Sequence, residues 1–203
     1  MRTSRRQDGF SVIELVATLG IIGVVAAAAI PSTTRTLSDL RLRGDARNVH
    51  NAVALAKMRA AAHYTRERLF VDRSNNSFHI EYWDKTGQVW TNENDPTVYL
   101  QSGVTFDYGA LTSPPLNTQT TLAQAPPCRV GSSAGPSGGS DISGTSCIVF
   151  NSRGIPVDPN GNITGNSALY ITDGTSTYGV TLSATPLVRL WWSKASANGW
   201  VQR

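Results

Sequence analysis

Residues 10–30 read FSVIELVATLGIIGVVAAAAI, a run of 21 residues in which Glu14 is the only charged side chain. At 1.5 Å per residue, a helix of this length spans roughly 30 Å, about the thickness of the hydrocarbon core of a bilayer. Arg2, Arg5 and Arg6 precede the run. Because positive charge favours the cytoplasmic side of a membrane, the sequence predicts a membrane-spanning helix with its N-terminus in the cytoplasm.

A secretory signal peptide is the alternative, since it also combines a basic start with an apolar core and ends in small residues. The run Ala26–Ala29 fits such a cleavage site. Glu14 argues against it, because a charged group within an apolar span costs about 2.5–3.5 kcal/mol on insertion scales. Such a carboxylate needs a cation, and proteolysis just upstream would supply one as a free α-amino group.

The segment Asp8–Leu15, DGFSVIEL, resembles the prepilin cleavage signature G-F-(T/S)-L-I-E-L of type IV pilins and type II secretion pseudopilins. The resemblance implies that prepilin peptidase cuts between Gly9 and Phe10 and N-methylates Phe10. It also implies that Glu14 pairs with the Phe10 amine of a neighbouring subunit during filament assembly. Two groups that are each costly in lipid then neutralise each other only when the subunits are in register.

Pro31 matches the helix-kinking proline common in the same family. The resemblance therefore implies a leader at 1–9 that is removed and a transmembrane half-helix at 10–31. Beyond the proline, apolar residues recur at spacings of three and four, which predicts an amphipathic second half at 32–65 that packs on a sheet. These residues are Leu42, Ala46, Val49, Val53, Ala56 and Ala60.

Residues 66–203 change to short alternating segments separated by turn residues, which are typical of β-strands. A stretch rich in Pro, Ser, Thr and Gly at about 111–145 predicts a long irregular loop. One helix followed by about eight strands indicates an α+β fold with a mainly antiparallel sheet. The resemblance implies that this is a type IV pilin-like fold. The expected strands are Leu69–Arg73, Ser77–Trp83, Gln88–Thr91, Val98–Tyr108, Ser146–Asn151, Leu169–Thr172, Gly179–Ser183 and Leu187–Ser193.

Cys128 and Cys147 are the only cysteines. In an exported protein such a pair is most simply a disulfide, which would stabilise the fold by roughly 3 kcal/mol, whereas a cytosolic location would favour two separate thiols. The three histidines lack metal-ligand spacing, and no phosphate loop or hydrolase motif occurs. We therefore expect no metal, no cofactor and no enzymatic activity.

The segment Cys147–Pro156, CIVFNSRGIP, is similar to the GspH/FimT branch of minor pseudopilins, which carries F-x-x-x-G-x-P after a strand. Together the two resemblances imply a minor pilin or pseudopilin in the bacterial inner membrane, with its body in the periplasm. It would join other pilins and prime a type IV pilus or a type II secretion pseudopilus.

Two other functions stay open. Some FimT-group members take up DNA in natural transformation, and here Arg189, Lys194 and Arg203 are interleaved with Trp191, Trp192 and Trp200. Cations of this kind neutralise phosphates and exposed indoles stack on bases. The alternative to stacking is that Trp191 or Trp192 packs in the core of the last strand, since neighbours on a strand face opposite sides. The second function left open is that of a membrane-tethered domain that never polymerises.

Overall fold

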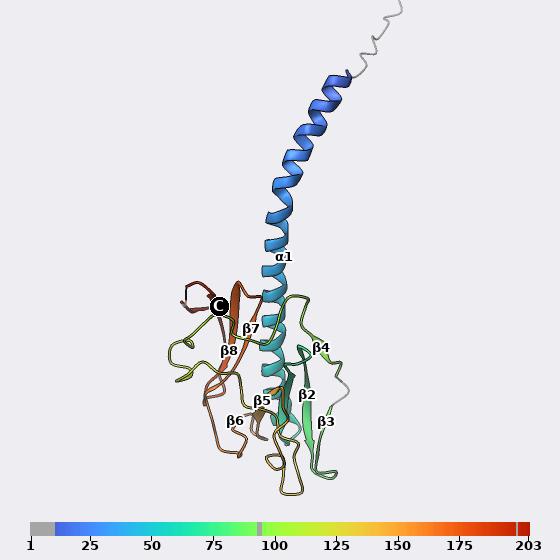
Figure 1. The fold of residues 1–203 in the computed structure, drawn as a ribbon. Coiled ribbons are helices and arrows are strands. Elements are labelled where there is room, and N and C mark those ends of the chain that lie inside the picture. Colours follow the sequence, from blue (N-terminus) through green and yellow to red (C-terminus); the bar gives the residue numbers. More distant parts are fainter. Residues whose placement is uncertain (1–10, 93–94, 198) are drawn as a thin grey trace, which may run out of the picture. The chain divides into compact units, whose positions relative to one another are not determined.

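The computed structural model describes residues 11–92, 95–197 and 199–203, without the side chains of 28–33. The chain divides into two compact units, Met1–Ser38 and Asp39–Arg203. One helix, α1 (Val12–Ala62), contributes to both (Figure 1). Its bounds agree with the single long helix that the sequence predicts. Helical geometry continues through Pro31, and the bend expected at this residue stays a prediction.

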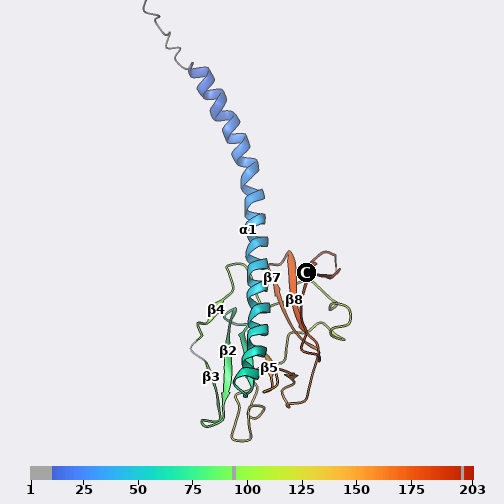
Figure 2. The ribbon, with the colours of Figure 1, turned by 180° about the vertical axis from the view of Figure 1, so that it is seen from behind.

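The part of α1 in the second unit buries the predicted apolar stripe. Figure 2 shows this part of the helix in front of the strands. The stripe lies in one core with residues of the sheets, for example Leu69, Ile148 and Val180. Burial of this stripe therefore holds the helix on the β-rich body, as predicted. The residues that are completely buried are Leu42, Ala46, Val49, Val53, Ala56 and Ala60.

The first sheet, sheet A, carries its strands in the order β3-β2-β1-β5-β6, with β4 also paired to β2, and every pairing is antiparallel. Leu69 pairs with Ile80 on one side and Ile148 on the other, so this row faces the core. The strands are β1 (Glu67–Asp72), β2 (Ser77–Asp84), β3 (Val89–Asn92), β4 (Val98–Tyr99), β5 (Thr145–Phe150) and β6 (Pro156–Val157).

The second sheet, sheet B, has the order β10-β9-β8-β7 and is also antiparallel. Its strands are β7 (Ser167–Thr172), β8 (Ser176–Leu182), β9 (Val188–Lys194) and β10 (Val201–Gln202). The α+β class is therefore confirmed. Two separate sheets, rather than the one expected, pack against α1.

Three strand predictions need correction. The strand expected at Val98–Tyr108 is only the two-residue β4, because the chain turns at Gly103, whose φ of +86° suits glycine. β6 and β10 were not expected, since two residues are too few to show an alternating pattern.

The long loop closes the outer edge of β7. The side-chain amide of Gln124 donates to the Tyr170 carbonyl and accepts from the Tyr170 N–H, both at 2.9 Å, as a neighbouring strand would. The Ala125 N–H donates to Ala168 O at 2.7 Å. Ahead of the loop, Thr105 and Thr172 exchange two backbone hydrogen bonds at 2.9 Å. These contacts satisfy edge groups that would otherwise invite pairing with another chain.

A pair of leucines on α1 tests the packing of this helix. Leu42 is completely buried, whereas Leu40 is 55% exposed. We expect Leu42→Ala to lower the free energy of unfolding by about 2–5 kcal/mol, because it leaves a cavity. Leu40→Ala, the matched control, should change it by less than about 0.5 kcal/mol. Urea unfolding followed by tryptophan fluorescence measures both, and equal effects would contradict the observed packing.

Candidate functional site

The first part of α1 exposes apolar side chains around its whole circumference. Nine large ones between Val12 and Val25 are 54–80% exposed. A helix that is apolar on every side is normally buried among other helices or in lipid. This surface is therefore a candidate for contact with partners outside the chain. The nine are Val12, Ile13, Leu15, Val16, Leu19, Ile21, Ile22, Val24 and Val25.

Within the described residues, no helix reaches the combined length and apolarity of a membrane span. The transmembrane assignment of residues 10–31 stays a prediction.

Glu14 lies exposed in the first turn of α1. The Ser11 carbonyl accepts hydrogen bonds from the N–H groups of Glu14 at 3.0 Å and Leu15 at 3.1 Å. The pattern Ser11-x-x-Glu14 is typical of a helix start, and a carboxylate there interacts favourably with the positive end of the helix dipole. This second role of Glu14, at the start of the helix, was not predicted, although the Ser11-x-x-Glu14 spacing is visible in the sequence.

Gly9 and Phe10 lie outside the described residues. The cleavage position and the predicted pairing of the Phe10 amine with Glu14 therefore stay predictions.

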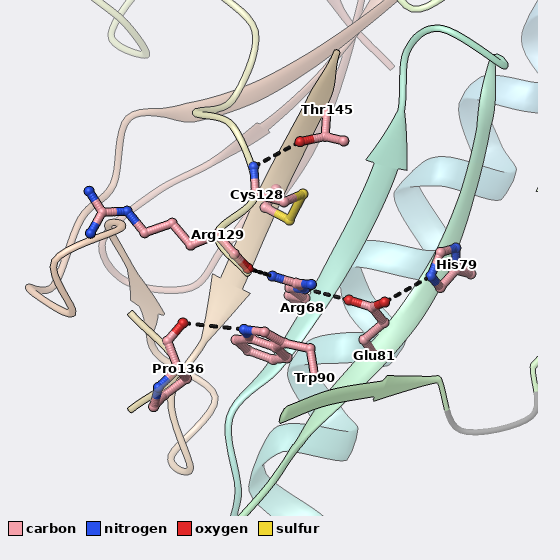
Figure 3. A network of polar contacts seen from close by, with 9 residues as sticks. Arg68, His79, Glu81, Trp90, Cys128, Arg129, Pro136 and Thr145 are labelled. Atoms are coloured by element: carbon pink, nitrogen blue, oxygen red, sulfur yellow. Dashed lines mark hydrogen bonds and ion pairs between the residues drawn. A yellow bond between two sulfur atoms is a disulfide. The ribbon is translucent and has the colours of Figure 1, made fainter. Parts of the chain in front are cut away.

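A buried arginine organises the face of sheet A that lies opposite α1 (Figure 3). Leu69 of β1 faces the core, so strand alternation places its neighbour Arg68 on this opposite face. Arg68 Nε donates to Glu81 Oε2 and Arg68 Nη1 donates to the Arg129 carbonyl, both at 2.5 Å. The guanidinium also lies 4.2 Å from the centroid of the Trp90 ring, a cation–π contact. Arg68 therefore links two strands of sheet A to the long loop.

Electrostatics in this cluster favour the ion pair. Burial raises the pKa of Glu81, but the hydrogen bond with His79 and the charge of Arg68 lower it more, so the net pKa lies below its usual value. Burial lowers the pKa of Arg68, against the attraction of Glu81. The hollow beside Arg68 measures about 20 Å³, room for a single water molecule. The arrangement thus holds the loop in place and offers no room for an organic ligand.

The predicted disulfide between Cys128 and Cys147 is present and fastens the same loop to β5 (Figure 3). The Cys128 N–H donates to Thr145 Oγ1 at 3.0 Å. Further along the loop, Trp90 Nε1 donates to the Pro136 carbonyl at 3.2 Å. The irregular segment is therefore held at several points, although it has no strand of its own.

The three cations predicted to contact DNA do not lie on one surface. Leu190 packs against the core, so alternation along β9 places Arg189 on the opposite face of sheet B. Lys194 is exposed at the end of β9. The Arg203 N–H donates to Leu190 O at 2.9 Å, and its guanidinium lies 5.1 Å from the Trp192 ring centroid, on the core side. The structure thus separates Arg189 from Arg203, and DNA contact stays a prediction.

The three tryptophans lie on both faces of sheet B. Trp192 packs partly buried against the core, the alternative that the sequence left open. Trp191 lies on the other face, where its Nε1 donates to Thr181 Oγ1 at 2.8 Å. Trp200 Nε1 donates to the Ser113 carbonyl at 2.8 Å. A Cβ built on Gly179, the cross-strand partner of Trp191, would lie 3.4 Å from the Trp200 ring, so Trp191 and Trp200 share one face of sheet B and Trp192 lies on the other.

Two arginines of α1, the half-buried Arg43 and the exposed Arg47, lie beside Arg203. Arg43 and Arg47 of α1 line a hollow together with it. Their spacing of four residues places them on one side of the helix, which was visible in the sequence. The sequence does not show that Arg203 lies near them, because its position depends on the pairing of β10 with β9.

Residues 4–30 match the family model described as the prokaryotic N-terminal methylation motif. The match includes Gly9, Phe10 and Glu14, and it supports a type IV pilin-like protein that prepilin peptidase processes and that assembles with other pilins. No curated protein and no solved structure matches the chain.

The Arg68–Glu81 pair predicts a specific acid sensitivity. The folded-state pKa of Glu81 lies below its ordinary value of 4.5, so its contribution to stability is complete above that pH and is lost as the pH falls through the folded-state pKa. Glu81→Gln should lower the free energy of unfolding at pH 7 by about 1–3 kcal/mol, since Arg68 loses a charged partner. The gap between wild type and variant should narrow below about pH 4.5.

Denaturant unfolding across this pH range measures the effect. Asp141→Asn is the control, because Asp141 pairs with Arg129 at 3.2 Å but its side chain is 55% exposed, and its loss should cost less than about 1 kcal/mol. A gap between wild type and Glu81→Gln that stays constant as the pH falls would contradict this assignment.

Proposed function

We propose that this chain is a minor pilin or pseudopilin of the GspH/FimT branch, which joins or primes a type IV pilus or a type II secretion pseudopilus. The observation that carries the proposal is the methylation motif at 4–30, followed by a helix whose apolar side chains are exposed on every side. Such a surface is stabilised when lipid or neighbouring helices cover it.

In this proposal, prepilin peptidase removes residues 1–9 at the cytoplasmic face of the bacterial inner membrane and methylates Phe10. Residues 10–31 then anchor the chain in the lipid, with the body in the periplasm. During assembly Glu14 pairs with the Phe10 amine of a neighbouring subunit. An unpaired carboxylate in an apolar bundle is costly, so this pairing selects the correct register.

The body supports the choice of branch through the segment Cys147–Pro156. Phe150 is completely buried at the end of β5. Gly154 has a φ of +70°, and a Cβ built on it would lie 3.1 Å from the Lys57 carbonyl of α1. Pro156 then begins β6. The F-x-x-x-G-x-P pattern thus has a physical reason, because the turn passes close to the helix backbone where a side chain would crowd it.

Mass spectrometry of the chain isolated from bacterial membranes tests the processing step. We expect the mature protein to lack residues 1–9 and to carry one additional methyl group on Phe10. Gly9→Val should leave the leader attached, because it removes the glycine of the cleavage motif. A mature N-terminus within or just after Ala26–Ala29 would instead identify a secretory signal peptide and contradict the proposal.

Glu14→Ala tests assembly separately from processing. The variant should be cleaved and methylated but should fall at least about tenfold in sheared filaments, since the bundle loses a charge pair. Glu14→Asp keeps the charge and serves as the control. Unchanged incorporation of Glu14→Ala would favour a membrane-tethered domain that never polymerises.

A further inference from the structure

A hollow of about 480 Å³ opens within the second unit between α1 and sheet B. Three of its lining side chains are arginines, two from the helix and one from the end of the chain that follows β10. The hollow is therefore assembled from segments that are far apart in the sequence. Its lining residues are Arg43, Arg47, His50, Asn51, Tyr178, Leu190 and Arg203.

Positive charge predominates here. Arg43 and Arg47 are one helical turn apart, and like charges at this spacing destabilise a helix by about 0.2–0.5 kcal/mol. Asp39, one turn before Arg43, offsets part of this charge. Asp45 does not, because it is buried and accepts the Gln101 N–H at 2.8 Å. An anion from outside the chain would relieve the remaining repulsion.

Two of the guanidinium groups are held by aromatic side chains. Tyr178 is 2% exposed, and its hydroxyl forms a side-chain hydrogen bond with Arg43 that raises the pKa of this arginine. Arg203 lies over the Trp192 ring at 5.1 Å. Fixed guanidinium groups lose less conformational entropy when they bind a ligand than free surface arginines do.

The shape of the site indicates the class of ligand. Guanidinium groups bind carboxylates through paired, parallel hydrogen bonds. The hollow lies between a helix and strands and is open at Arg47 and Arg203, which are exposed. Arg189 lies on the opposite face of sheet B, so the basic residues do not form the continuous track that a nucleic acid strand follows. A cluster of three arginines without a continuing basic track favours a short acidic segment over a polymer backbone.

We propose that Arg43, Arg47 and Arg203 form a docking pocket for Asp or Glu side chains presented by an acidic segment of a partner protein. Charge complementarity supplies the attraction, and the Tyr178 hydroxyl acts as a positioning group for Arg43. The proposal does not depend on the assignment of the chain as a pilin.

Fluorescence anisotropy with the full chain in detergent micelles tests this pocket. The probe is a fluorescein-labelled hexaglutamate peptide at low salt, with hexaglutamine as its uncharged counterpart. We expect hexaglutamate alone to bind, and Arg43→Gln with Arg47→Gln to weaken it at least about tenfold, since charged hydrogen bonds are lost. The matched control, Arg73→Gln with Arg153→Gln, removes the same charge from two exposed arginines elsewhere in the second unit.

Equal weakening by both double variants would overturn the proposal, because binding would then reflect net charge alone. The absence of hexaglutamate binding would also overturn it. Tighter binding of a labelled single-stranded oligonucleotide, lost in the Arg43/Arg47 double variant, would assign the site to nucleic acid instead. Thermal unfolding of each variant checks that the fold is retained. Tyr178→Phe, which keeps the ring, should weaken hexaglutamate binding less than the Arg43/Arg47 double variant does.

Discussion

Burial of one side of α1 is the interaction on which the second unit depends. The buried stripe consists mainly of small residues such as Ala46, Ala56 and Ala60, which allow strands to approach the helix closely. Both sheets contribute to the same core, with Ile148 from sheet A and Val180 from sheet B. The helix is thus the element that unites two antiparallel sheets into one body.

The same helix has a different surface in the first unit. Nine large apolar side chains there remain exposed, although burial of each would contribute about 1.5–3 kcal/mol. A chain that leaves so much apolar surface open requires a cover of lipid or protein. The two parts of α1 therefore differ in role. The part in the second unit packs in the core of the body, and the part in the first unit presents an apolar surface to partners or lipid.

The long loop is held in place by polar interactions and a disulfide as well as by apolar packing. Arg68 and Glu81 connect sheet A to this loop, the disulfide fastens it at Cys147, and Gln124 substitutes for a strand at the edge of β7. Breaking one of the polar contacts leaves a buried polar or charged group without its partner, which is costly. The loop is in this way ordered without regular secondary structure.

The sequence allowed the apolar elements to be predicted better than the tertiary placement of charges. The stripe from Leu42 to Ala60 was predicted residue by residue, because helical periodicity is a local property. The disulfide followed from the two available cysteines. The division into two sheets and the position of Arg203 beside Arg43 were not predictable, since both depend on strand pairing between distant segments. Short strands such as β6 carry too few residues for a pattern.

Site-specific photo-crosslinking from the exposed helix identifies what covers its apolar surface. A photoreactive amino acid placed at Ile22, whose side chain is 62% exposed, would report what covers this surface in bacteria that produce the protein. We expect crosslinks to other pilin chains and to membrane lipid, and a marked loss of the pilin crosslinks when Glu14 is replaced by Ala. Crosslinks confined to the chain's own body, or none in the membrane fraction, would contradict this expectation.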